Sequence, residues 1–370
     1  MKLSFIRKIG TVRLVISSIS GILALSSMQA NSEEQLSTIF GGHSPDSTYT
    51  IGYEDYDLLL KQNVLDLGHS FRKKASRSVA RTGTRLKAKR NLQTALEGNR
   101  FFFKNFKTSE RKQLLTNIRV SLETLPDELA LKEFNKNVQL AFWFNLYNVT
   151  LLENLVNIAP RTNMKEYLYG DDSILDKKLI VVDGIKLSLN NIQYDIILPN
   201  YNENPNVIYG FFQGIIGAPN LRSEAYTGKN VQIQLKKNGQ EFVNSNRGTY
   251  GSSSENFRVS SIYQRNKNWF PDFNNDLKKH LLELIETKDS QKIKNTNEFR
   301  VDIEDMSFAN LSGGFRDFGM RAVSGSAQMS SVEGLSISQY MNFASNAELE
   351  LFRDLMMNSH IQRPKLTEVK

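Results

Sequence analysis

The spacing of apolar residues along the chain predicts a protein rich in helices. From Val138 to Ile158 apolar side chains recur with a helical period, and Pro160 predicts the end of that helix. Shorter stretches with the same period cover 53–70, 275–286 and 345–359. Helices are therefore expected through most of the chain.

Strands are predicted at fewer places. The β-rich runs 178–182 and 185–189 flank Asp183-Gly184, a pair typical of a type I′ hairpin turn. The apolar run 206–212 and the segment 256–266 are each expected to be a strand. Between them, 231–248 is expected to be a helix that ends at Gly248 in the left-handed conformation.

These elements predict an α+β fold, with a small, mostly antiparallel sheet packed with several helices in a single large domain. The 370 residues, 40% of them hydrophobic, suffice for one such domain. We expect a signal peptide at 1–30, a polar linker at 31–50, the domain at 51–318, and a loose Gly/Ser-rich segment with a C-terminal helix at 319–370.

The first thirty residues have the three parts of a secretory signal peptide. Four cations precede a short apolar run, and small residues lead up to a cleavage site expected after Ala30. The apolar run, about 14 residues long, is too short to span a bilayer, although a retained membrane anchor is the alternative. We therefore expect a periplasmic or secreted protein with no membrane span after cleavage.

Cysteine content and charge narrow the picture further. The chain has no cysteine, which excludes disulfides and a lipid-modified cysteine. Loss of the four signal-peptide cations lowers the 47 basic residues to 43, against 39 acidic ones. So small an excess gives little reason to expect nucleic acid as a partner.

The most basic part of the chain is the segment 71–100. It has ten Lys or Arg residues against one acid, Glu97, and is expected to be helical. One interpretation is a surface for an anionic envelope partner, carried by Arg81, Arg85, Lys87, Lys89 and Arg90. The alternative is a solvated helical face with some arginines buried in ion pairs.

Neither a metal site nor a cofactor site is expected. The histidines are scattered, at positions 43, 69, 280 and 360, and a zinc site needs several convergent ligands. The spacing of Asp272, Asn274 and Asp276 resembles a calcium loop, but Leu277 stands where the turn requires glycine. No phosphate-binding or dinucleotide-binding glycine motif is present either.

Two stretches draw attention as a possible site. Residues 204–226 combine an apolar run with Gln213 and a turn between Gly214 and Gly217, an arrangement by which enzymes often present a nucleophile, yet no Cys, His or Asp stands there. The stretch 142–148 places Asn145, Tyr147 and Asn148 inside an apolar helix. Buried amides need hydrogen bonds, so these residues are expected either to clamp a loop or to orient a ligand.

Five blocks in the expected order resemble the family named domain of unknown function 547. They are residues 141–156, 176–192, 204–228, 242–248 and 257–273, and a sixth block at 80–103 resembles an exported bacterial branch. The resemblance covers about 53–318. It implies an α+β domain and no established activity.

The chain departs from the family pattern at its reactive positions. Many members have Ile-Glu-His where this chain has Ile192-Gln193-Tyr194, and His-Phe where it has Ile208-Tyr209. Many have cysteine at the positions of Gln213 and Ala218. Because a thiolate mechanism needs sulfur and an activating base, the resemblance implies that this chain does not perform such chemistry there.

We therefore expect a non-catalytic, exported binding protein, a pseudoenzyme, with no catalytic residue. Its ligand would be a small molecule or an envelope partner. The candidate binding residues are Asn145, Tyr147, Asn148, Tyr194, Gln213, Arg222, Glu224, Tyr226 and Arg247. One alternative is a periplasmic hydrolase or transferase that uses Glu224, Tyr194 or Tyr226 for acid–base chemistry. Another is a structural envelope protein.

Overall fold

The computed structural model describes residues 36–72, 92–160 and 163–311, with the backbone of three short strands at 331–332, 335–336 and 366–368. The predicted signal peptide, the five cations from Arg81 to Arg90 and the helix predicted at 345–359 lie outside these residues. These three remain predictions.

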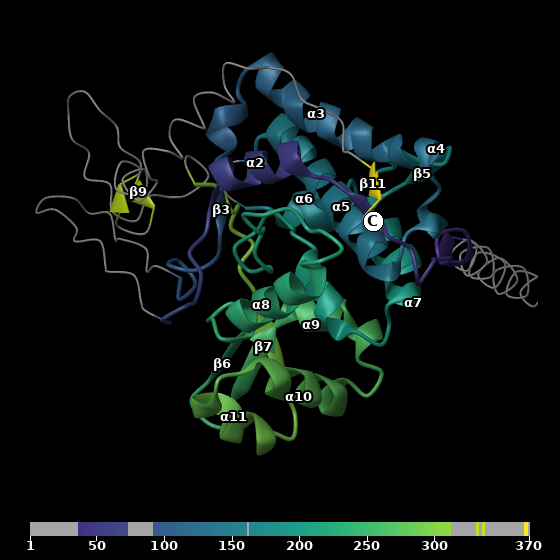
Figure 1. Cartoon of the computed structure of the whole chain (residues 1–370). Coiled ribbons are helices and arrows are strands. Elements are labelled where there is room, and N and C mark those ends of the chain that lie inside the picture. The colour runs from purple at the N-terminus through teal and green to yellow at the C-terminus, as the bar shows by residue number, and fades with distance from the viewer. Residues whose placement is uncertain are drawn as a thin grey trace, which may run out of the picture.

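The long helix α5, Lys136–Ile158, lies at the centre of the fold (Figure 1). Asn135 caps its start by accepting a hydrogen bond from the amide of Val138 at 3.1 Å. Ala159 ends it in the left-handed conformation with φ 49°, directly before Pro160. The end of the helix thus agrees with the sequence prediction, and the start lies two residues before the first apolar position of the pattern, Val138.

Helices α2, Glu54–Asn63, and α3, Ser109–Glu123, lie near α5 in the same half of the molecule (Figure 1). A half-buried ion pair joins α3 to α5, with Arg119 Nε 2.5 Å from Glu153 Oε2. Phe40, within the stretch predicted as a linker, is buried with its ring 5.1 Å from that of Trp143.

The other half of the molecule contains a three-stranded sheet and its helices (Figure 1). Strands β6, Thr249–Gly251, and β7, Phe257–Ser260, pair antiparallel, whereas β7 and β8, Arg300–Ile303, pair parallel. The longer helices of this half are α8 (Val231–Val243), α10 (Phe273–Leu284) and α11 (Thr287–Lys294).

Short elements connect these parts. The helical ones are η1 (Phe103–Phe106), α4 (Leu125–Glu128), η2 (Leu131–Glu133), α6 (Lys165–Tyr169), α7 (Leu198–Asn200), α9 (Ser261–Arg265) and η5 (Lys267–Trp269). The strands are β1 (Tyr49–Ile51), β2 (Val64–Leu65), β3 (Arg100–Phe101), β9 (Ser331–Val332), β10 (Leu335–Ser336) and β11 (Leu366–Glu368). They form antiparallel two-stranded ladders, β1 with β11, β2 with β3 and β9 with β10.

The predicted hairpin is confirmed. Strands β4, Ile180–Val182, and β5, Ile185–Leu187, pair antiparallel around Asp183 and Gly184, whose φ angles are 50° and 74°. Both angles lie in the left-handed region that a type I′ turn requires. The segment after the hairpin forms a π-helix, η3, Asn191–Ile197.

Three local predictions are wrong. Residues 206–212 are not a strand, because Pro205–Gly210 forms the 3₁₀ helix η4, begun by Asn204 Oδ1 accepting from the amide of Asn206 at 3.2 Å. Helix α8 stops at Val243, and Gly248 does not have positive φ. The strand predicted at 256–266 ends at Ser260, whose side chain caps helix α9.

One continuous hydrophobic core nevertheless connects both halves of the described chain. The α+β prediction, with small and mostly antiparallel sheets among several helices, is confirmed. In the described residues, no helix combines the length and the apolar character that crossing a membrane requires.

Candidate functional site

Two asparagines on α5 hold the stretch 204–226 against the helix. The amide of Asn148 donates to the carbonyl of Gly210 at 3.1 Å, and its Oδ1 accepts from the backbone N–H of Phe212 at 3.1 Å. Asn145 makes the same pair of bonds with the backbone of Tyr226, at 2.7 and 3.0 Å. Both amides therefore clamp a loop, which is the structural alternative of the sequence analysis.

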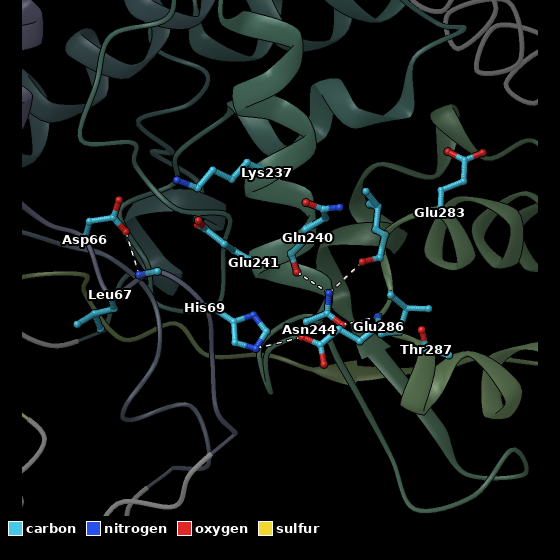
Figure 2. Close-up of a pocket in the computed structure, with 13 residues that line it drawn as sticks. Asp66, Leu67, His69, Lys237, Gln240, Glu241, Asn244, Glu283, Glu286 and Thr287 are labelled. Carbon is cyan, nitrogen blue, oxygen red and sulfur yellow. Dashed lines mark hydrogen bonds and ion pairs between the residues drawn. The ribbon is translucent and has the colours of Figure 1, made fainter.

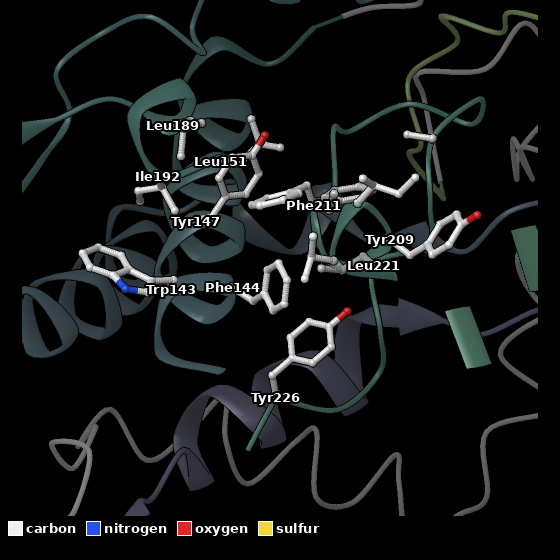
Figure 3. Packing of buried hydrophobic residues seen from close by; sticks show 14 of the residues in the cluster. Trp143, Phe144, Tyr147, Leu151, Leu189, Ile192, Tyr209, Phe211, Leu221 and Tyr226 are labelled. Atoms are coloured by element: carbon white, nitrogen blue, oxygen red, sulfur yellow. The ribbon is translucent and has the colours of Figure 1, made fainter. Parts of the chain in front are cut away.

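Aromatic rings fill the space between the two clamps. Figure 3 shows Phe144 and Tyr147 of α5 facing Phe211 and Tyr226. The ring of Phe211 lies 5.1 Å from that of Phe144 and 4.9 Å from that of Tyr147. A Cβ at Gly210 would lie 2.3 Å from the ring of Phe144, so only glycine lets the backbone approach this closely.

The turn after Gln213 is held from the opposite side by residues 305–309. Ile216 and Gly217 donate backbone hydrogen bonds to the carbonyls of Ser307 and Asp305, both at 2.9 Å. Gly214 lies in the turn that the sequence predicted and has a positive φ of +72°. A Cβ at this position would lie 2.5 Å from Leu155 Cδ1. Gln213 therefore sits at the start of a turn with little freedom to move.

Gln213 lies among three tyrosines and an arginine. Its Oε1 accepts a hydrogen bond from the hydroxyl of Tyr169 at 3.0 Å, and the guanidinium of Arg265 lies 4.9 Å from the centre of the Tyr169 ring. The hydroxyl of Tyr194 donates to the backbone carbonyl of Arg265 at 3.4 Å. We call Tyr147, Tyr169, Tyr194, Gln213 and Arg265 the Gln213 cluster.

The hydroxyls of this cluster stay protonated at neutral pH. Burial raises the pKa of Tyr194 to about 12 and that of Tyr169 above its usual range. Burial raises the pKa of Tyr147 well above its usual range, and the neighbouring Tyr194 and Tyr169 add to the effect. These groups are hydrogen-bond donors and not bases.

Two other residues at positions that the sequence analysis singled out are engaged within the protein. Gln193 donates to Asn266 Oδ1 at 2.7 Å. Tyr209, next to Ile208, has its hydroxyl 2.8 Å from His280 Nε2 and 3.1 Å from the hydroxyl of Tyr263. The hydrogen bonds of these side chains are therefore used to hold neighbouring elements together.

Arg222 belongs to a separate, buried network. Its Nη1 lies 2.6 Å from Glu241 Oε2, and its Nε donates to Gln234 Oε1 at 2.9 Å. Gln234 in turn donates to Glu224 at 3.1 Å, and Glu224 is exposed. The guanidinium of Arg222 thus ties the loop to α8, and the partner of its ion pair is Glu241.

Arg247 is also turned inward. Its Nη1 donates to the carbonyls of Ile216 and Ala218 at 3.3 and 2.8 Å, which fixes the far end of the turn. Burial lowers its pKa to about 10, so it remains charged at neutral pH. Of the nine candidate residues, the structure gathers Tyr147, Tyr194 and Gln213 and separates them from the network of Arg222 and Glu224.

Two cavities lie away from the Gln213 cluster. One, about 690 Å³, runs along β1 and is lined by Glu224, Asp57 and Lys61 among others. The other, about 820 Å³, is lined by loop 66–69, α8 and residues 283–287 (Figure 2). At its edge, His69 Nε2 lies 3.1 Å from Glu286 Oε1.

The ends of the segment 71–100 are described, and each carries one of its cations. Arg72 is half-buried and donates to the carbonyl of Thr249 at 2.5 Å. Arg100 has no exposed surface. Both arginines are therefore used within the fold, but Arg72 donates to a backbone carbonyl and not to an acid, and Arg100 stands in strand β3 and not in the expected helix.

The sequence analysis missed two members of the cluster, Tyr169 and Arg265. Tyr169 stands in a short segment with no periodic pattern, before the hairpin. Arg265 lies within the stretch expected to be a strand, although that stretch belongs to one of the five family-like blocks. Had helix α9 been predicted there, Arg265 would have been recognised as the last residue of that helix.

The described residues offer no cluster of acidic and histidine side chains that could form a metal site. In the three described ranges between 36 and 311, no group of three or more His, Asp or Glu side chains is placed to hold a metal ion. Asp66, Glu283 and Glu286 line the cavity of Figure 2 from different elements.

Residues 131–243 match the model of a family described as "Protein of unknown function, DUF547". This range carries α5, the β4–β5 hairpin and the turn after Gln213, and it contains the first three family-like blocks. Neither the curated proteins nor the solved structures yielded a match to the chain.

Proposed function

We propose that this chain is an exported, non-catalytic binding protein of the periplasm. Its residues 131–243 match the model of the DUF547 family, whose function is unknown. Its binding site is the family's own site, around Gln213, which has lost the family's reactive groups. The ligand is a small molecule or a segment of an envelope partner.

The observation that carries the proposal is the hydrogen bond between Gln213 and Tyr169. The resemblance to the family implies a cysteine where this chain has the amide of Gln213, and a phenol that stays protonated faces that amide. Neither an amide nor a protonated phenol supplies the nucleophile or base that acyl transfer requires. Both are common in binding sites, where hydroxyls and amides orient a ligand.

Export rests on the N-terminal sequence. Its basic start, short apolar run and small residues before the predicted cleavage site after Ala30 support it. The absence of cysteine is compatible with an oxidising compartment, because no thiol is then exposed to it.

Native mass spectrometry tests the binding part of the proposal. The mature chain is incubated with a small-molecule extract of a Gram-negative envelope, and retained masses are identified. Gln213→Leu should lose the retained mass, because it removes the amide at similar volume. Gln232→Leu, on the exposed face of α8, should keep it, and thermal unfolding should show that both variants fold.

The acid–base alternative would place a hydrolase or transferase reaction at Glu224, with Tyr194 or Tyr226. Its support is the 690 Å³ cavity that Glu224 lines. Against it stand the exposure of Glu224 and the burial of Tyr226, which raises the pKa of that tyrosine to about 12. Turnover that Glu224→Gln abolishes would favour this alternative over binding.

A further inference from the structure

The Gln213 cluster contains more hydrogen-bond donors than acceptors. The hydroxyl of Tyr147 is fully buried and has no hydrogen-bond partner among the described residues. The same holds for Nε of Arg265 and for Nε1 of Trp269, whose ring lies 6.4 Å from that of Tyr194. A buried donor without an acceptor costs about 1–3 kcal/mol, so three in one region require an explanation.

The three donors belong to one neighbourhood of the fold. Arg265 touches Tyr169 through its guanidinium and Tyr194 through its backbone carbonyl. Trp269 lies one turn further along the chain, in η5. Tyr147 enters from α5, with its ring against Phe211, and its hydroxyl lies near enough to Tyr194 and Tyr169 for their charge to raise its pKa.

The charge of the neighbourhood is incompletely balanced. Arg265 Nη1 lies 3.2 Å from Glu304, and the side chain of that glutamate is 40% exposed. An exposed ion pair of this kind contributes little and exchanges readily with solvent. The guanidinium thus keeps the capacity to pair with a second carboxylate through Nε.

Tyr169 is the side chain through which a ligand would enter. It is the most exposed member of the cluster, at 38%, and lies on the five-residue helix α6. Rotation of an exposed tyrosine side chain is fast, and here it requires the loss of the bond to Gln213 and of the contact with the Arg265 guanidinium. A ligand that replaces this bond also gains the donors behind it.

We propose that the Gln213 cluster binds the carboxylate group of a small ligand, with the hydroxyl of Tyr147 and Nε of Arg265 as its donors. A carboxylate supplies up to four acceptor positions and the negative charge that Arg265 prefers. The inference rests on the proposed function, since it names the ligand chemistry of that site. Peptides and sugar acids are the two sources to be distinguished.

Calorimetry with three probes provides the test. N-acetyl-alanyl-alanine carries a peptide carboxylate, its C-terminal amide removes the charge at nearly the same shape, and glucuronate carries a sugar carboxylate. We expect at least one acid to bind and the amide to bind at least tenfold more weakly. Binding should weaken as the salt concentration rises, because part of it is electrostatic.

Two variants then locate the site. Tyr147→Phe removes only the unpaired hydroxyl, so thermal stability should stay the same or rise while affinity falls about tenfold to a hundredfold. Tyr201→Phe is the matched control. Its hydroxyl donates to the carbonyl of Lys136 at 2.8 Å, so its loss should lower stability and leave affinity unchanged.

Each outcome decides the inference. Acid-selective binding that Tyr147→Phe weakens and Tyr201→Phe spares supports it. Equal binding of acid and amide, affinity unchanged in Tyr147→Phe, or no binding of either acid at millimolar concentration overturns it. If neither acid binds, the envelope extract separates the two claims. A retained ligand that has no carboxylate would support the proposed function and refute only the inference that the site binds a carboxylate.

Discussion

Individual side chains decide how the site is built, and Asn148 shows this most directly. Both ends of its amide bond the backbone on either side of Phe211, so no other side chain of similar size replaces it fully. The sequence pointed to Asn148 because a polar residue stood inside an apolar helix. It did not reveal which backbone groups the amide would bond, since those lie more than sixty residues away.

Asn148→Ala should lower the free energy of unfolding by about 2–4 kcal/mol, because it leaves a buried C=O and a buried N–H without partners. Urea unfolding measures the change. Asn154→Ala on the same helix is the control, since its half-buried amide bonds only Thr150 at 2.8 Å and should cost about 1 kcal/mol or less. Equal losses would argue against a clamp.

Gln213 is suited to a chemical probe, because the chain has no natural thiol. Gln213→Cys should react with iodoacetamide at least tenfold more slowly than Glu224→Cys, since position 213 is 4% exposed and position 224 is exposed. Similar rates for the two single variants would contradict the described burial.

At the scale of elements, the sequence predicted best where the cause is local. The type I′ hairpin follows from Asp183-Gly184, and α5 from its apolar period and Pro160. The prediction for 206–212 failed because an apolar stretch that is buried on all sides has no periodicity to separate strand from helix. Asn204 and Pro205 were the signals for the helical start that was missed.

The turn after Gln213 combines backbone strain with close packing. Gly214→Ala should cost about 1–3 kcal/mol more than Gly184→Ala in thermal or urea unfolding. Both glycines have positive φ, at +72° and +74°, but only at Gly214 would the added Cβ meet a neighbour, Leu155 Cδ1 at 2.5 Å. If the two substitutions cost the same, the contact with α5 has no energetic role.

At the scale of the whole molecule, the single core makes stability depend on groups far from the site. His280 is buried, bonds Tyr209 and has no partner at Nδ1 among the described residues. Burial lowers its pKa from 6.5 to about 4. The folded protein therefore resists protonation of this histidine, while the unfolded chain accepts a proton below pH 6.5.

This difference in proton binding makes the protein less stable in acid. The contribution of His280 is complete above pH 6.5, falls as the pH drops toward 4 and is constant below that. Between pH 7 and pH 5 the wild type should lose about 2 kcal/mol more stability than His280→Gln, measured by urea unfolding at each pH. Parallel losses in both proteins would remove His280 as the cause.

The fold class and the match of residues 131–243 to a family model could be predicted from the sequence, because both depend on patterns spread over many residues. The site could be predicted only in part. Its family positions marked Tyr194 and Gln213, and the apolar helix marked Tyr147. No sequence pattern singled out Tyr169 or Arg265. They lie far from Gln213 in the sequence, and only the fold brings them to it.

The central claim is that the site around Gln213 binds its ligand without converting it. The most direct measurement follows the retained envelope ligand by mass spectrometry over several hours with the wild type and with Gln213→Leu. We predict that the wild type binds the ligand and returns it with unchanged mass. A product that accumulates with time and protein concentration, and that Gln213→Leu fails to make, would contradict the account.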